Sequence, residues 1–165
     1  MKKTWIFLVL LLTTIGLTAA ALAQQRPPTT SGGSGMALLN LKDTVALHGY
    51  DAVSYFEDEQ PRRGNRRIQE RVGGATYYFA SRGNRYTFLG NAPKYQPQFG
   101  GYCATSMAIG LAEDINPEVF TVYDGKLYLF KDDAARARFL SDPRGTIAAA
   151  EHNYFELAQK QRRYY

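Results

Sequence analysis

Tyr95-Gln-Pro-Gln-Phe-Gly-Gly-Tyr-Cys-Ala-Thr-Ser-Met-Ala-Ile-Gly110 is the stretch around which the rest of the chain is organised. It contains the only cysteine, Cys103, directly after a Gly-Gly-Tyr turn, and Met107 follows four residues later. If the segment after Gly101 is helical, the side chains of Cys103 and Met107 lie one turn apart on the same face. A thiol and a thioether would then face the same point.

The sequence repeats its pattern on both sides of this stretch. Gly74-x-x-Tyr-x-Phe79 matches Gly125-x-x-Tyr-x-Phe130, and each motif is followed nine residues later by a Phe-Leu pair and then by a proline. Upstream, residues 49–54 (Gly-Tyr-Asp-Ala-Val-Ser) match residues 101–106 (Gly-Tyr-Cys-Ala-Thr-Ser). Offsets of 51 and 52 residues indicate an internal duplication, with residues 49–93 and 101–143 as the two units. A chance likeness between two aromatic hairpins is the alternative.

Each unit is predicted to consist of a loop or short helix, a β-hairpin and a helix. We expect an opening strand within residues 39–47, strands at 76–79, 119–122 and 127–130, and helical residues at 52–56. Ser81 and Asp132 are expected to cap the two helices, with a Phe-Leu pair of each helix pointing inward. A third helix is expected from Thr146 to Gln159, after Asp142-Pro143. The predicted fold class is therefore α+β, a duplicated unit plus a C-terminal helix, in one domain of residues 36–160.

The N-terminus has the order of a secretory signal peptide. Lys2 and Lys3 precede an apolar run from Trp5 to Leu17, and Ala21-Leu-Ala23 is a cleavage site. We expect residues 1–23 to be removed, residues 24–35 to form a flexible linker, and residues 161–165 to form a basic tail. An uncleaved anchor is the alternative, but it usually needs about 20 apolar residues. The expected location is the periplasm, with no stable membrane insertion after cleavage.

The chain is modestly basic, with 20 Lys and Arg against 15 Asp and Glu. Residues 61–71 hold much of the excess, since Arg62, Arg63, Arg66, Arg67 and Arg71 face only Glu70. We favour a hairpin or edge strand whose charges prevent aggregation. An anionic lipid headgroup, a polyanion or an acidic protein is the alternative. A nucleic acid is not expected, because an exported protein rarely meets one and the run lacks interleaved stacking aromatics.

Four stretches resemble the exported, stand-alone YHS-domain proteins of bacteria: residues 49–56, residues 74–81 with Asn84, residues 93–104 and residues 124–129. The resemblance implies a small α+β unit of a kind associated with metal binding. Metal-associated YHS domains carry cysteines at the positions of Ser54, Ala80 and Asn84. All three thiols are missing here, so the ordinary soft-metal site of the family does not carry over.

Three functions remain open. Cys103 and Met107, with one or both of His48 and His152, could bind copper(I), since soft sulfur donors and imidazole select it. Cys103 could be a nucleophile at a helix start, but the flanking signature of a cysteine hydrolase is missing and we do not expect an enzyme.

The third function is a non-catalytic binding module for a small ligand or an envelope protein. Its expected binding residues are Tyr50, Asp51 and Tyr102, and its tyrosines would line a groove. We therefore expect an exported binding module, with copper(I) as the best named ligand. The three functions differ in the environment they require for Cys103, since a nucleophile needs partial exposure and a basic neighbour, whereas a core thiol is buried. We expect Cys103 to be largely buried on a short helix, with Met107 on the same face and His48 as the nearer histidine.

Overall fold

The computed structural model describes residues 37–163. The predicted signal peptide, the whole predicted linker, the first residue of the predicted domain and the last two residues of the predicted tail lie outside this range. Within residues 37–163, no helix is long and apolar enough to cross a membrane. Helices and strands are both present, so the α+β class is confirmed.

The first half of the domain contains four strands that form one sheet in the order β1-β2-β4-β3. Its elements are β1 (Leu41–Lys42), β2 (Val45–Ala46), the 3-10 turn η1 (Leu47–Gly49), α1 (Ser54–Glu57), β3 (Asn65–Val72), β4 (Ala75–Phe79), α2 (Arg82–Gly90) and α3 (Ala92–Tyr95). The short opening strand predicted within residues 39–47 is present as β2, but the sequence did not predict the strand before it, β1. Asp43 and Thr44 both have positive φ, so the chain turns back between β1 and β2 as a two-residue hairpin.

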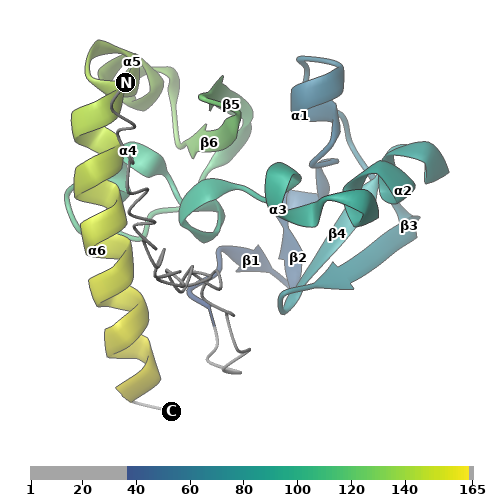
Figure 1. The fold of residues 1–165 in the computed structure, drawn as a ribbon, viewed down its shortest axis with the longest axis horizontal. Coiled ribbons are helices and arrows are strands. Elements are labelled where there is room, and N and C mark those ends of the chain that lie inside the picture. The colour runs from purple at the N-terminus through teal and green to yellow at the C-terminus, as the bar shows by residue number, and fades with distance from the viewer. Residues whose placement is uncertain (1–36, 164–165) are drawn as a thin grey trace, which may run out of the picture. The chain divides into compact units, whose positions relative to one another are not determined.

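The second half contains a two-stranded antiparallel sheet and ends in a long helix (Figure 1). Its elements are the 3-10 turn η2 (Gln98–Gly101), α4 (Ala104–Met107), β5 (Asn116–Tyr123), β6 (Lys126–Phe130), α5 (Asp133–Ser141) and α6 (Pro143–Arg163). α6 begins three residues before the predicted Thr146, because the Asp142 carboxylate accepts a hydrogen bond from the N–H of Gly145 at 3.0 Å. α6 also continues to Arg163, into the segment predicted as a tail.

The two halves repeat the same elements 51 residues apart. β3, β4 and α2 contain 8, 5 and 9 residues, and β5, β6 and α5 have the same lengths. Both hairpins have an irregularity at the same place, after the pairs Asn65–Phe79 and Asn116–Phe130. η1 and η2 contain runs of positive φ at positions 52 residues apart. The offset of 51 to 52 residues between the repeated sequence motifs is therefore also the offset between equivalent structural elements.

The caps of the two equivalent helices lie where the sequence predicts them. Ser81 accepts the N–H of Asn84, and Asp132 accepts the N–H of Ala135. The inward Phe-Leu pairs are only half correct: the phenylalanines are buried, but Leu89 is 44% exposed and its equivalent Leu140 is 49% exposed. Consecutive helix residues point about 100° apart. A nine-residue helix that packs on one side therefore buries only one residue of such a pair.

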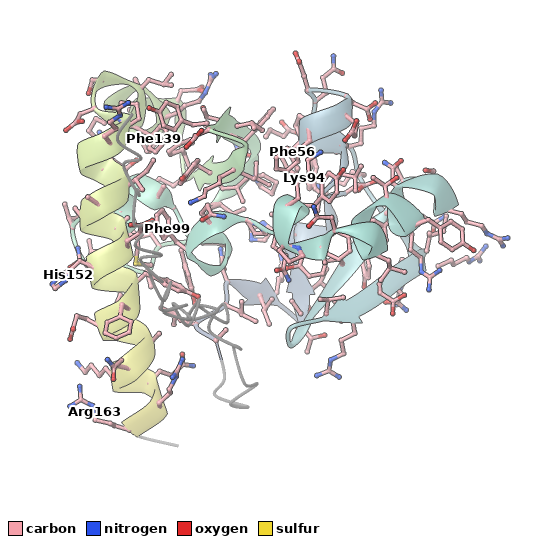
Figure 2. All side chains as sticks on the ribbon, in the orientation of Figure 1. Phe56, Lys94, Phe99, Phe139, His152 and Arg163 are labelled. Atoms are coloured by element: carbon pink, nitrogen blue, oxygen red, sulfur yellow. The ribbon has the colours of Figure 1, made fainter. Side chains whose placement is uncertain are left out.

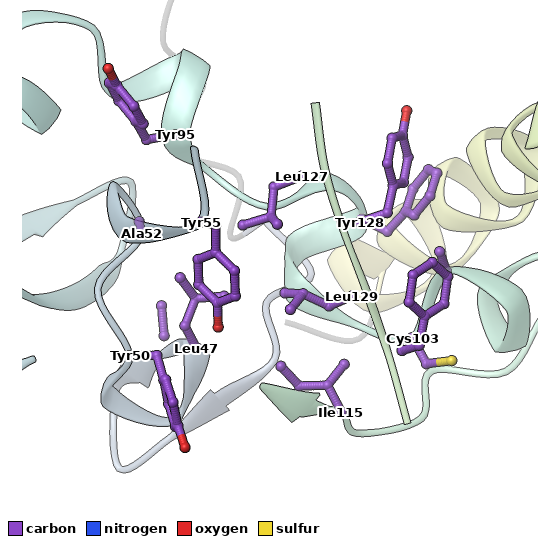
Figure 3. Packing of buried hydrophobic residues seen from close by; sticks show 14 of the residues in the cluster. Leu47, Tyr50, Ala52, Tyr55, Tyr95, Cys103, Ile115, Leu127, Tyr128 and Leu129 are labelled. Atoms are coloured by element: carbon purple, nitrogen blue, oxygen red, sulfur yellow. The ribbon is translucent and has the colours of Figure 1, made fainter. Parts of the chain in front are cut away.

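A continuous core joins the halves. Leu127 and Leu129 of β6 form parallel bridges with Pro97 and Cys103, and all of β6 except its first residue is buried. In Figure 3, Leu127 and Leu129 lie between Tyr55 and Cys103. The organising stretch at residues 95–110 therefore lies beside β6.

Candidate functional site

Cys103 and Met107 are both fully buried, at 0% exposure. Cys103 is the residue before α4, and the N–H of Met107 donates a hydrogen bond of 2.9 Å to its carbonyl. The two side chains thus start one helical turn apart. The expected burial of Cys103 is confirmed, but the residue itself lies just before the short helix and has a non-helical backbone. Cys103 is further fixed by its own N–H, which donates to the carbonyl of Glu113 at 3.0 Å.

His48 is held by a carboxylate. Its Nε2 lies 2.8 Å from Oδ1 of Asp114, which also accepts hydrogen bonds from the Asn40 amide and from the N–H of Ile115. Burial raises the pKa of Asp114, but these hydrogen bonds outweigh burial and lower it overall. This cluster clamps η1 of the first half onto the loop before β5.

His152 lies on α6 and is exposed (Figure 2). Its neighbour Asn153 donates hydrogen bonds to the carbonyls of Met107 and Ala108 at 3.0 and 2.9 Å. α6 is thus fastened to α4 next to His152, while the imidazole itself faces solvent. Among residues 37–163, no group of three or more His, Cys, Asp and Glu side chains is arranged to hold a metal ion.

The three other predicted binding residues form hydrogen bonds within the fold. Asp51 is fully buried, and its carboxylate accepts the N–H of Val53 and of Ala80 and the side-chain amide of Asn84, at 2.7 to 2.9 Å. The Tyr50 hydroxyl donates to Glu118, and the Tyr102 hydroxyl donates to the carbonyl of Leu39.

A cavity of about 250 Å³ lies between the first sheet, the organising stretch and α6; we call it the seam cavity. Its lining is Ala37, Leu39, Leu41, Ala46, Leu47, Gly73, Ala75, Tyr77, Gln96, Pro97, Gly100 and Tyr154. None of these lining residues is charged. The walls are therefore largely apolar, with Tyr77, Gln96 and Tyr154 as the polar side chains.

Two tyrosines give the seam cavity its hydrogen-bonding groups. Burial raises the pKa of Tyr77 to about 12, although a hydrogen bond with the side chain of Gln96 acts in the opposite direction. Burial also raises the pKa of Tyr154, whose hydroxyl donates to the carbonyl of Leu38 at 2.8 Å. Both phenols are therefore neutral at physiological pH and act as hydrogen-bonding groups, not as bases.

The equivalent place in the second half has a different character. A wider groove of about 600 Å³ lies beside Tyr128, which corresponds to Tyr77. Four of its lining residues are charged: Asp124, Lys126, Arg144 and Glu151. The groove beside Tyr128 is therefore lined by charged residues, whereas the lining of the seam cavity is uncharged, although both lie against equivalent strands.

Sequence reasoning did not identify the lining of the seam cavity. Tyr77 was assigned only to a strand and Tyr154 only to a helix. The available signal was the repeat itself, which places Tyr77 and Tyr128 at equivalent positions, but it does not reveal that α6 reaches back over the first half. No family model matches the chain, and comparison with curated proteins and with solved structures gave no match either.

Proposed function

We propose that the chain is a non-catalytic binding module that takes a small, neutral, mostly apolar molecule into the seam cavity. The observation that carries this proposal is the uncharged cavity of about 250 Å³. Apolar pockets with a few convergent polar groups are the usual form of a small-molecule site, although most are larger, at roughly 300–1,000 Å³. The predicted signal peptide would place this module in the periplasm, in keeping with the resemblance to exported YHS-domain proteins.

The volume and chemistry of the seam cavity define the ligand class. A cavity of about 150 Å³ lined by apolar side chains can bind benzene. The seam cavity therefore accommodates a single ring with one or two small substituents. A charged ligand is disfavoured, because burying a charge without a partner is costly. A hydroxyl or carbonyl group on the ring could pair with the Tyr77 hydroxyl or the Gln96 amide.

Calorimetric titration of the purified protein with phenol tests the proposal. Phenol should bind saturably, and Ala75→Leu should weaken binding at least about tenfold, because a leucine at this buried position fills part of the cavity. Tyr77→Phe keeps the shape and removes one hydroxyl, so binding should weaken by about 2- to 12-fold.

Tyr128→Phe is the matched control. Tyr128 is buried and holds the equivalent place in the second half, but it does not line the seam cavity. Its substitution should leave phenol binding unchanged. Equal loss in both tyrosine variants, or no saturable binding by the unmodified protein, would contradict the proposal.

Copper(I) binding by Cys103 and Met107 is a second candidate. It is supported by the backbone hydrogen bond that sets these residues one turn apart and by the burial of both side chains. A thiolate and a thioether are soft ligands suited to copper(I). His48 contributes to this candidate only if its ring leaves Asp114, and His152 only if its exposed ring turns toward α4.

A further inference from the structure

The first sheet has one face that its helices do not cover. Ala75, Tyr77 and Phe79 of β4 are buried, whereas Thr76 and Tyr78 point to the opposite face and are only partly buried. This opposite face carries a groove of about 430 Å³, lined by residues of β1, β2, η1 and β3 together with Tyr78. The first sheet therefore presents an accessible surface opposite its packed face.

Three cations lie on this face, and we call them the basic face: Lys42, Arg66 and Arg71. Lys42 and Arg66 line the groove with Tyr78, and Arg71 is the direct cross-strand partner of Thr76. Within residues 37–163, none of the three side chains forms an ion pair, in contrast to Arg62 and Arg85. Asp43 is the one acidic residue in the groove lining.

Charge is unevenly distributed over the domain. Residues 37–163 contain 17 Lys and Arg against 15 Asp and Glu, and residues 61–71 alone contain five Arg against one Glu. The rest of the described domain therefore has a net charge of −2. The β3 region is a local positive field on an otherwise slightly acidic domain, and such a field attracts an anionic partner.

We propose that the basic face binds the phosphate headgroups of an anionic phospholipid bilayer. β1 and β3 are the two edges of a four-stranded sheet, so the cations span about 14 Å at roughly 4.8 Å per strand. One phosphate group cannot reach both edges, whereas a bilayer presents many. Each Lys or Arg close to an anionic lipid surface adds to the attraction, so the three cations of the basic face act together on a bilayer. This proposal is independent of the seam cavity and of its ligand.

The test compares sedimentation of the protein with phosphatidylcholine vesicles that contain or lack phosphatidylglycerol. The protein should sediment only with the anionic vesicles and should be released by high salt. The variant Lys42→Glu/Arg66→Glu/Arg71→Glu should bind at least about tenfold more weakly. Glutamates also protect an edge strand from aggregation, so this variant separates lipid binding from edge protection.

The matched control is Lys126→Glu/Arg138→Glu/Arg144→Glu, which changes the net charge equally at three exposed positions of the second half. This control should retain binding, and circular dichroism checks that both variants are folded. If both triple variants lose vesicle binding equally, the net charge alone explains the binding, and the proposal is overturned. Displacement from vesicles by inorganic phosphate but not by chloride at the same ionic strength, or tighter binding to heparin than to anionic vesicles, would also overturn it, in favour of a single-anion site or a soluble polyanion.

Discussion

Asp51 and Cys103 occupy equivalent positions with different chemistry. Each follows a Gly-Tyr pair, and each donates its N–H to the carbonyl of a residue in the equivalent loop, Arg62 or Glu113. The Asp51 carboxylate satisfies three N–H groups that connect η1, β4 and α2. Because a buried polar group needs such partners, these hydrogen bonds give Asp51 a role in holding the fold together. Its equivalent, Cys103, packs among apolar side chains.

Asp114 should make the stability of the folded protein depend on pH in the acid range. The pKa of its carboxyl is lowered from 3.8, since the hydrogen bonds from Asn40, Ile115 and His48 outweigh burial. A carboxyl whose pKa is lower in the folded state stabilises the fold above its unfolded pKa, and this contribution is lost as the pH falls through the folded value. Below about pH 4, the urea midpoint of unfolding should therefore decrease less steeply with falling pH in Asp114→Asn than in the unmodified protein.

Asp124→Asn is the control for this acid dependence. Asp124 is exposed in the turn between β5 and β6, where its φ is positive and asparagine is equally suitable. This variant should keep the acid slope of the unmodified protein. If Asp114→Asn shows the same decrease of the urea midpoint with falling pH as the unmodified protein, the hydrogen bonds to the Asp114 carboxylate do not stabilise the fold.

Secondary structure was predictable where local chemistry decides it. Ser81 and Asp132 mark their helix starts by capping, and the β-branched, aromatic and other apolar residues of β4 and β6 mark strands. The left-handed residues of η1 and η2 were not predictable, since Leu47, His48 and Phe99 have positive φ although they are not glycine. Tertiary packing imposes these conformations, and no local preference signals them.

α4 is the element that tests the copper(I) candidate. If Cys103 and Met107 form the site, the protein should take up one copper(I) ion per chain in competition with a chromogenic chelator under reducing conditions. Cys103→Ser and Met107→Leu should abolish uptake, because each removes a soft ligand with little change in volume. His152→Ala, at an exposed position, should retain it. Absence of stoichiometric uptake would eliminate this candidate.

The seam cavity is a property of the whole domain. Its walls come from the segment before β1, from β2 and β4, from residues 96–100 and from α6. Tyr77 and Tyr154 line it together although they are 77 residues apart in the sequence. No local pattern indicates that α6 runs back to Leu38. The sequence could therefore suggest a tyrosine-lined binding surface, but it could not locate one.

A crystal structure of the protein with 4-bromophenol, located by the anomalous signal of bromine, would show directly whether the seam cavity binds a ligand. We expect a bromine peak inside the seam cavity, with the ligand hydroxyl within hydrogen-bond distance of Tyr77 or Gln96. Crystals of the Ala75→Leu protein should show no peak at that place. A bromine peak only outside the cavity, or a cavity filled by the protein's own side chains, would contradict the central claim that this chain binds a small neutral molecule there.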